Sequence, residues 1–243
     1  RICFLDPFQG TVLANFAQEK FGAQKAYCLG ELGNEYDQGL INYFEQAFDG
    51  TVEKDSFPTN TSDFTTYLNK AVNEGVDVIF CPVSITYSTQ ILKLAASLGI
   101  DIPILGGDTL DSNMVLEAAA GSDVQLYVST FYQEGGSPEF DEGFKAWLAE
   151  DSTAMTNNGG NDTIAAVTAM GYDAYYVALE ALKAAGSTDP GDVKAALPDV
   201  TYTGVSGSIA FDEQGDAIRD TAYIKTADTA NNVWALETVQ TVE

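Results

Sequence analysis

The chain has 243 residues, of which 45 % are hydrophobic and 19 % charged, a composition typical of a globular protein that buries a substantial core. Its 36 acidic and 11 basic side chains give a net charge of −25, so a nucleic-acid backbone or an anionic membrane surface would be repelled. Histidine is absent, which removes the commonest general base, the Ser-His and Cys-His nucleophile pairs and most transition-metal sites.

The amino-terminal part of the chain predicts a strand followed by a helix. Residues 1–6 are predicted to form the strand, and any targeting segment is expected to lie outside this chain. A helix is expected over residues 9–21, where four apolar residues share one face: Val12, Leu13, Phe16 and Ala17. No apolar run approaches the roughly 20 residues needed to cross a bilayer.

Between residues 25 and 132 the chain alternates five times between a short apolar run and an amphipathic stretch. The runs occupy residues 26–29, 52–57, 76–81, 102–105 and 124–132. The expected helices cover residues 35–48, a segment capped by Ser62 or Asp63, residues 86–98, and a short one capped by Asp111 or Ser112. This alternation predicts an α/β fold with a doubly wound parallel sheet.

After Tyr132 the pattern becomes helical. Helices are expected from residue 138 to about 149, over residues 163–185 with Asn161 or Asp162 as cap, and from Pro190 to 197. No strand is predicted from residue 137 to 203. Helices without a sheet of their own cannot bury their apolar faces, so this segment must pack against something else.

The carboxy-terminal tail is predicted to be extended. Residues 204–211 resemble a strand, 212–216 a turn, and 221–226 with 233–238 a hairpin. The three cysteines, Cys3, Cys28 and Cys81, lie in apolar strand-like runs and are expected to be buried free thiols rather than a disulfide or a nucleophile.

Leu105-Gly106-Gly107-Asp108 is the most informative motif, because it places an acid on a glycine-flanked turn where the fourth strand ends. Open α/β sheets bind ligands at the carboxyl ends of their strands. There is no G-x-G-x-x-G after a strand, no phosphate-binding loop and no calcium-loop spacing. No catalytic residue, cofactor or metal site is therefore predicted, and the chain is not expected to be an enzyme.

Several short stretches lie along the chain in this order: Phe8-Gln9-Gly10, Asn34-Glu35-Tyr36-Asp37-Gln38-Gly39-Leu40, Asp63-Phe64, Gln90-Ile91-Leu92-Lys93, Gly106-Gly107-Asp108, Gly171-Tyr172-Asp173-Ala174 and Phe211-Asp212-Glu213-Gln214-Gly215-Asp216. By these stretches the chain resembles the extracytoplasmic solute-binding proteins of bacterial ABC importers, in particular the leucine/isoleucine/valine-binding family. Each stretch is weak alone, but together they follow the family's order and spacing over nearly the whole chain.

The resemblance implies two doubly wound lobes joined by crossing strands, with the ligand in the cleft between them. Residues 1–133 would form the second lobe with hinge crossings at both ends. Residues 134–203 would supply helices of a truncated first lobe, and residues 204–243 a hinge strand and a hairpin that returns to the second lobe. The expected first-lobe sheet has no counterpart here, so the chain is expected to be a fragment, with that segment as a separate chain or a missing part.

The resemblance also implies a set of ligand-binding residues. Asp108 would bind the α-ammonium group of the ligand, against the alternative of a turn or capping acid. Tyr36 would pack its ring on the ligand, against the alternative of a core or surface tyrosine. Ser84 stands where the family more often has an aromatic residue, and Thr86 is its neighbour; Ser84 alternatively caps the helix. Phe8 and Tyr132, with Gln9, lie near the presumed hinge and either touch the ligand or brace the hinge.

The predicted function is that of the substrate-binding component of an ABC transporter. It would work outside the cytoplasm, in the periplasm or anchored by lipid at the cell surface. There it would capture a small zwitterion, a branched-chain or other amino acid, and deliver it to a permease in the membrane. One alternative is a ligand-sensing receptor or regulatory domain of the same fold, and another is a structural or assembly subunit.

Overall fold

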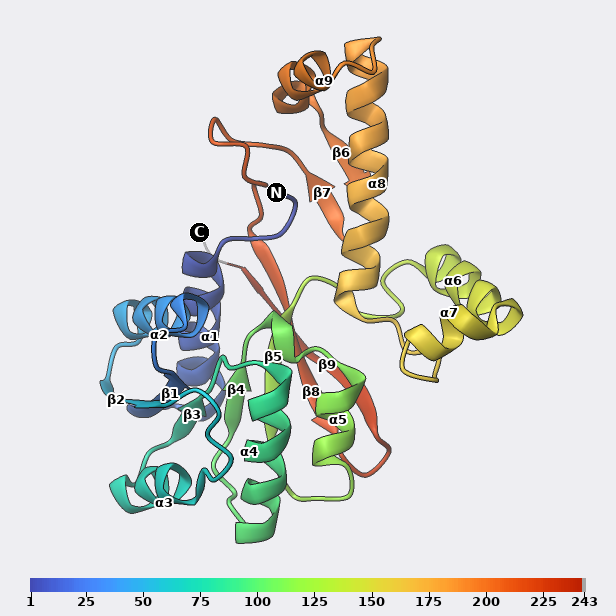
Figure 1. The fold of residues 1–243 in the computed structure, drawn as a ribbon. Helices are drawn as coiled ribbons and strands as arrows, with labels where there is room; N and C mark the ends of the chain where they lie inside the picture. The colour runs from blue at the N-terminus through green and yellow to red at the C-terminus, as the bar shows by residue number, and fades with distance from the viewer. Residues whose placement is uncertain (242–243) are drawn as a thin grey trace. The chain divides into compact units, whose positions relative to one another are not determined.

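A computed structural model describes residues 1–241, and the chain divides into two compact units (Figure 1). The larger unit contains Asp6–Thr130 and the chain from Thr221 onward, and the smaller unit contains Arg1–Leu5 and Phe131–Asp220. Both units are therefore built from segments that are distant in sequence. The candidate binding residues belong to the larger unit, with the exception of Tyr132.

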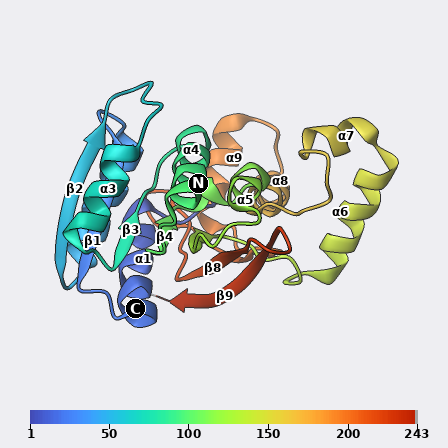
Figure 2. The same cartoon turned by 90° about the horizontal axis from the view of Figure 1, so that it is seen from below.

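The larger unit is organised around a seven-stranded sheet in the order β2-β1-β3-β4-β5-β8-β9. Figure 2 labels β2, β1, β3 and β4 in this order, with β8 and β9 beyond them. Neighbouring strands among the first five are parallel. The strands are β1 (Lys25–Glu31), β2 (Thr51–Phe57), β3 (Val78–Phe80), β4 (Ile104–Gly106), β5 (Leu126–Thr130), β8 (Thr221–Asp228) and β9 (Val233–Thr241). The predicted doubly wound parallel α/β fold is confirmed.

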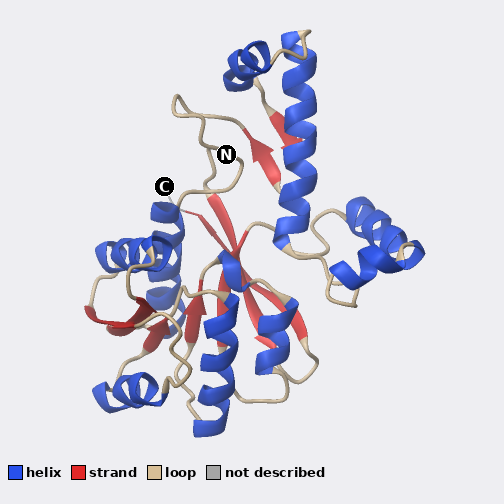
Figure 3. Ribbon diagram, viewed as in Figure 1, coloured by secondary structure: helices blue, strands red, loops and turns tan. Residues whose placement is uncertain are grey.

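Helices cover both faces of this sheet (Figure 3). The helical segments are α1 (Asp6–Phe21), α2 (Glu35–Ala47), α3 (Thr65–Glu74), α4 (Ile85–Leu98), the 3₁₀ turn η1 (Asp108–Leu110) and α5 (Asn113–Ala119). On one face, Phe16 of α1 lies 5.4 Å from the Tyr127 ring and Phe44 of α2 lies 4.5 Å from the Phe80 ring. On the other face, apolar residues of α3, α4 and α5 form one buried cluster with the strands.

Side-chain alternation along the strands explains why both faces are apolar. In β5, Leu126 and Val128 belong to the cluster beneath α4 and α5, whereas Tyr127 packs against α1. Successive side chains of a strand point to opposite faces, so a strand covered by helices on both sides must be apolar throughout. All five residues of β5 are buried.

The carboxy-terminal hairpin extends the parallel sheet with two antiparallel strands. β8 pairs with β5, where Val128 faces Lys225 and Thr130 faces Tyr223, and β9 pairs with β8. The predicted hairpin is confirmed, and it is two residues longer at β8 and three residues longer at β9 than expected.

The smaller unit is mainly helical, as the sequence predicts. It contains α6 (Pro138–Glu150), α7 (Ser152–Asn157), α8 (Ala166–Ala185), α9 (Pro190–Ala196), the 3₁₀ turn η2 (Leu197–Asp199), and a two-stranded antiparallel sheet of β6 (Tyr202–Gly204) and β7 (Gly207–Ile209). Its buried cluster is small and consists of Val177, Ala181, Val200, Ile209 and Ala217. Trp147, Val167 and Tyr175 remain more than half exposed.

A buried carboxylate fixes the small sheet of this unit to α8. Asp173 is fully buried and accepts hydrogen bonds from the backbone N–H of Val205 at 2.9 Å, the N–H of Ser206 at 2.8 Å and the Ser206 hydroxyl at 2.5 Å. A Cβ at Gly204 would lie 2.3 Å from the same carboxylate, so only glycine fits there. Asp173 in the Gly171–Ala174 motif therefore has a structural role.

Several local predictions are wrong. Residues 1–5 form no strand, and α1 begins at Asp6 because an acid followed by Pro7 suits a helix start. β6 lies partly within residues 137–203, where no strand was predicted. A strand of three residues is too short to show an alternating pattern in the sequence. α7 was not expected. Neither Asn161 nor Asp162 caps α8, which begins three residues after the predicted start; Asn161 instead accepts from the Thr163 N–H.

Among the described residues, no helix combines the length and apolarity that a bilayer crossing requires.

Candidate functional site

The parallel strands bring several loops to one edge of the sheet. The chain leaves β1 at Glu31, β3 at Phe80 and β4 at Gly106, and the strand order places β3 between the other two. Because the strands are parallel, the loops that follow them lie at the same end. The strand order reverses between β1 and β3, which is where open α/β sheets form their binding crevices.

The loop after β1 is held rigidly at the start of α2. Asn34 caps the helix, because its Oδ1 accepts from the N–H groups of Tyr36 at 3.1 Å and Asp37 at 3.3 Å. The buried Asp37 carboxylate accepts from the Glu31 N–H at 2.8 Å, and burial raises the pKa of Asp37 to about 6. These contacts fix the backbone from which the Tyr36 side chain projects.

Asp108 lies at the first position of η1, and its carboxylate meets side chains from α1 and α2. Its Oδ1 accepts from Gln9 Nε2 at 2.8 Å and from the Tyr36 hydroxyl at 2.8 Å. Tyr36 Oη also lies 3.2 Å from Gln9 Oε1. Within residues 1–241 no hydrogen bond reaches Oδ2 of Asp108, which is half-buried.

The electrostatics of this cluster keep Tyr36 as a donor. Burial, followed by the charge of Asp108, raises the pKa of Tyr36, so the phenol stays protonated at neutral pH. The phenol and the Gln9 amide both donate to the same oxygen of the Asp108 carboxylate. The arrangement can therefore present a fixed negative charge, with one oxygen oriented by the protein and the other left for a cationic group.

The alternative of a capping or turn acid is not supported for Asp108. Its side chain accepts no hydrogen bond from its own turn in the part of the chain described here. Ser112 caps α5 by accepting from the Met114 N–H at 3.2 Å, as one of the two predicted caps. The other predicted cap, Asp111, is instead buried in an ion pair with Lys225.

Ser84 and Thr86 lie at the start of α4, after β3, and both are exposed. Ser84 occupies the N-cap position of α4, as the alternative predicted, although its side chain makes no capping hydrogen bond. No hydrogen bond within residues 1–241 joins either residue to Asp108. Phe8 is half-buried in the first turn of α1, next to Gln9. Ligand contact by these three residues stays a prediction.

Tyr132 lies in the smaller unit and its hydroxyl is occupied there. The hydroxyl donates to Asp141 Oδ1 at 2.6 Å and accepts from the Ser137 N–H at 3.0 Å, while the ring packs on Phe140. Asp141 Oδ2 also accepts from the Gly135 N–H at 2.6 Å. Tyr132 thus braces the loop before α6, and a role in ligand binding stays a prediction.

Gln9 is more central to the cluster than the sequence indicated. It is 1 % exposed and contacts both Tyr36 and Asp108. Gln9 lies three and four residues before Val12 and Leu13, so it shares the buried face of α1. A polar residue on an apolar helix face must find hydrogen-bond partners. The position of Gln9 on this face was therefore the feature of the sequence that could have predicted its place in the cluster.

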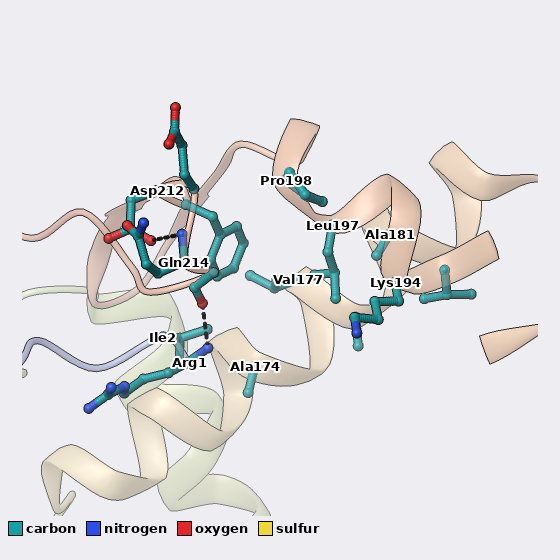
Figure 4. Close-up of a pocket in the computed structure, with 15 residues that line it drawn as sticks. Arg1, Ile2, Ala174, Val177, Ala181, Lys194, Leu197, Pro198, Asp212 and Gln214 are labelled. Carbon is teal, nitrogen blue, oxygen red and sulfur yellow. Dashed lines mark hydrogen bonds between the residues drawn. The ribbon is translucent and has the colours of Figure 1, made fainter. Parts of the chain in front are cut away.

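The smaller unit has an apolar pocket of about 440 Å³ (Figure 4). Its apolar wall comes from Ile2, Val177, Ala181, Val193, Leu197 and Phe211. The N-terminal amine of Arg1 donates to the Gly215 carbonyl at 3.0 Å at its rim. No residue predicted to bind a ligand lines this pocket.

Comparison with known proteins points to one family. The sequence profile described as "Periplasmic binding protein" matches residues 6–231. A Leu/Ile/Val-binding protein homolog from Brucella abortus is 28 % identical over 221 residues, which are 89 % of this chain and 57 % of that protein. The chain thus spans little more than half the length of this curated relative.

Solved structures of similar proteins agree with this family match. A leucine-binding protein from Thermotoga maritima superposes with a TM-score of 0.84 and 29 % identity, covering 99 % of this chain and 67 % of the other. An ABC transporter substrate-binding protein from Desulfitobacterium hafniense in complex with leucine gives a TM-score of 0.72 and 25 % identity, covering 97 % and 66 %.

Proposed function

The chain belongs to the periplasmic binding protein family, as its resemblance to the leucine/isoleucine/valine-binding members predicted, and from this we propose that it binds an amino acid. The family and the structural neighbours are binding proteins, which supports a binding role rather than catalysis. A branched-chain amino acid is the ligand class we propose, since the relatives' names specify leucine, isoleucine and valine.

The observation that carries this proposal is the environment of Asp108. Its carboxylate is held at the carboxyl end of β4 by Gln9 and Tyr36 on Oδ1, and Oδ2 is left for a cationic donor. An α-ammonium group is such a donor, and a hydrogen bond between charged groups contributes about 1.5–3 kcal/mol. We propose that Asp108 binds the ammonium group and that the Tyr36 ring packs beside it.

We further propose that the protein works outside the cytoplasm and delivers its ligand to an ABC permease. The family assignment supports both statements. The net charge of −25 is unsuited to an anionic lipid or nucleic-acid partner, which agrees with a small-molecule ligand and a protein partner.

The test is isothermal calorimetry of the complete protein with a panel of the twenty amino acids. We expect leucine, isoleucine or valine to bind with Kd below about 100 μM, equivalent to about −5.5 kcal/mol. Asp108→Asn should weaken binding roughly 10- to 150-fold. The asparagine keeps one oxygen for Gln9 and Tyr36, so its NH2 group, a donor, would face the ammonium group of the ligand, which is also a donor. The absence of binding by any amino acid would refute the proposal.

Asp101→Asn is the matched control. Asp101 is an exposed acid just before β4, at the opposite end of the strand from Asp108. Asp101→Asn changes the net charge by the same amount as Asp108→Asn. Because it is a surface substitution away from Asp108, the affinity of this variant for the ligand should stay within about twofold of the wild-type affinity. Equal losses in the two variants would indicate a general effect of charge and would contradict a specific role of Asp108.

A further inference from the structure

Asp111 follows Asp108 by three residues, and its carboxylate is buried in an ion pair. Lys225 Nζ on β8 lies 3.0 Å from Oδ2 and 3.2 Å from Oδ1, and the Thr130 hydroxyl at the end of β5 donates to Oδ2 at 2.5 Å. The side chains of Asp111 and Lys225 are 3 % and 2 % exposed. Two strands of the sheet therefore hold the end of the turn that carries Asp108.

The turn between the two acids is short and tightly packed. The Leu110 N–H donates to the Gly107 carbonyl and the Asp111 N–H to the Asp108 carbonyl, both at 3.1 Å. Leu110 is buried against Gly106, where a Cβ would lie 2.3 Å from Leu110 Cδ2. A shift of Asp111 would therefore be transmitted through the turn to the backbone of Asp108.

Stability alone is a weak explanation for this ion pair. Burying two charges removes both from water, and replacement of such a pair by apolar side chains is often neutral or stabilising. The pair does, however, specify where the turn lies, because the side-chain partners of the Asp111 carboxylate, Thr130 and Lys225, lie on the paired strands β5 and β8. Such a group is expected where a nearby side chain must be placed accurately.

We propose that Asp111, held by Lys225 and Thr130, is a positioning residue that fixes the turn so that the Asp108 carboxylate meets Gln9 and Tyr36. The ligand-dependent part of this inference rests on the proposed function. Its geometric part, the placement of Asp108 beside Gln9, can be tested without any ligand.

The main variant is the double substitution Asp111→Asn/Lys225→Met, which removes both charges and keeps an unbranched side chain on β8. Thr130→Val is the milder second variant, because it removes one hydrogen bond and retains the ion pair. Thr226→Val is the matched control: the Thr226 hydroxyl on β8 donates to the Leu126 carbonyl of β5 at 3.1 Å and does not touch Asp111.

The first measurement is NMR of the Gln9 side-chain amide in the ligand-free protein, assigned by its loss in Gln9→Ala. In the double variant the resonance should move toward its position in Asp108→Asn, and in Thr130→Val it should move part of the way. In Thr226→Val it should stay in place. An unmoved Gln9 resonance in the double variant, or in Thr130→Val if the double variant does not fold, overturns the proposal whether or not a ligand binds.

The second measurement compares leucine with 2-hydroxy-4-methylpentanoate, which has the same carboxylate and side chain but no ammonium group. The double variant should lose about tenfold in affinity for leucine and less than about twofold for the hydroxy acid. When the double substitution is made in an Asp108→Asn protein, it should lower the affinity for leucine by less than about twofold. Equal losses for both ligands, or an undiminished loss in that background, would make Asp111 a purely structural residue and overturn the proposal.

These readouts separate the two proposals. If the wild-type protein binds no amino acid, the proposed function fails, and the Gln9 resonance still decides whether Asp111 positions Asp108. If leucine binds and the double variant leaves both readouts unchanged, the proposed function stands and the positioning role is refuted.

Discussion

Replacing Gly107 by alanine would place a methyl group against the ends of the two side chains that bind Asp108. The new Cβ would lie 2.8 Å from Tyr36 Oη and 3.2 Å from Gln9 Oε1. Since ordinary contact begins at about 3.4 Å, Tyr36 Oη would have to retreat by about 0.6 Å (3.4 − 2.8). That movement stretches its 2.8 Å hydrogen bond to Asp108 beyond a useful length.

The expected cost follows from two opposing effects. A hydrogen bond to a charged group contributes about 1.5–3 kcal/mol. Gly107 has φ −76° and ψ −178°, which alanine adopts without strain, so the substitution gains about 0.4–1 kcal/mol by restricting the unfolded chain. We expect a net loss of about 0.5–2.5 kcal/mol in the unfolding free energy of the larger unit.

Urea unfolding followed by tryptophan fluorescence measures this change. Trp147 lies in the smaller unit and Trp234 in the larger one, so a Trp147→Phe background reports on the unit that contains Gly107. Gly39→Ala is the control, because the added Cβ would meet nothing within 4 Å and α2 should gain up to about 1 kcal/mol.

A second background decides whether the clash with Tyr36 is the cause. Tyr36→Phe removes the hydroxyl that the new methyl group would meet, so Gly107→Ala should cost little there. If Gly107→Ala is as destabilising in Tyr36→Phe as in the wild type, the methyl group acts elsewhere and the reasoning is wrong.

Two further predictions concern buried carboxylates. Asp173→Ala should lower the unfolding free energy of the smaller unit by about 2–5 kcal/mol, because three donors lose their acceptor. Asp189→Ala, which removes only the α9 cap, should cost about 1 kcal/mol, and equal losses in urea unfolding would contradict this difference. Asp37 has its pKa raised by burial to about 6, from 3.8, so its protonated form is favoured in the folded state and its contribution to stability is lost as pH rises through about 6. Asp37→Asn should remove that component, so the difference in unfolding free energy between wild type and variant should change between pH 4 and 7; a constant difference would refute the assignment.

The order of elements in the larger unit could be predicted because the central strands β1, β3, β4 and β5 are buried on both faces. Runs such as residues 124–132 stand out among polar loops, and the amphipathic helices between them fix the parallel connections. Strand ends were less predictable. β3 and β4 have three residues each although their apolar runs are longer, because burial in the core extends beyond the residues that form ladder hydrogen bonds.

The candidate site was predictable only in part. The glycine-flanked Asp108 at a strand end and Tyr36 after a capping Asn34 are local signals, and the structure brings these two side chains into contact. Partners that come from distant segments left little trace in the sequence. Gln9 reaches Asp108 across 99 positions and Lys225 reaches Asp111 across 114 positions, and both contacts depend on tertiary packing.

The ion pair between Asp111 and Lys225 also has a consequence for biosynthesis. A ribosome that has made residues 6–130 has produced every parallel strand of the larger unit, but it must add 95 more residues before Lys225 exists (225 − 130). Until then the turn after β4 lacks its cationic partner and β5 is an open sheet edge, which is prone to pairing with other chains. The nascent protein therefore depends on β8 and β9 both to cover this edge and to complete the turn.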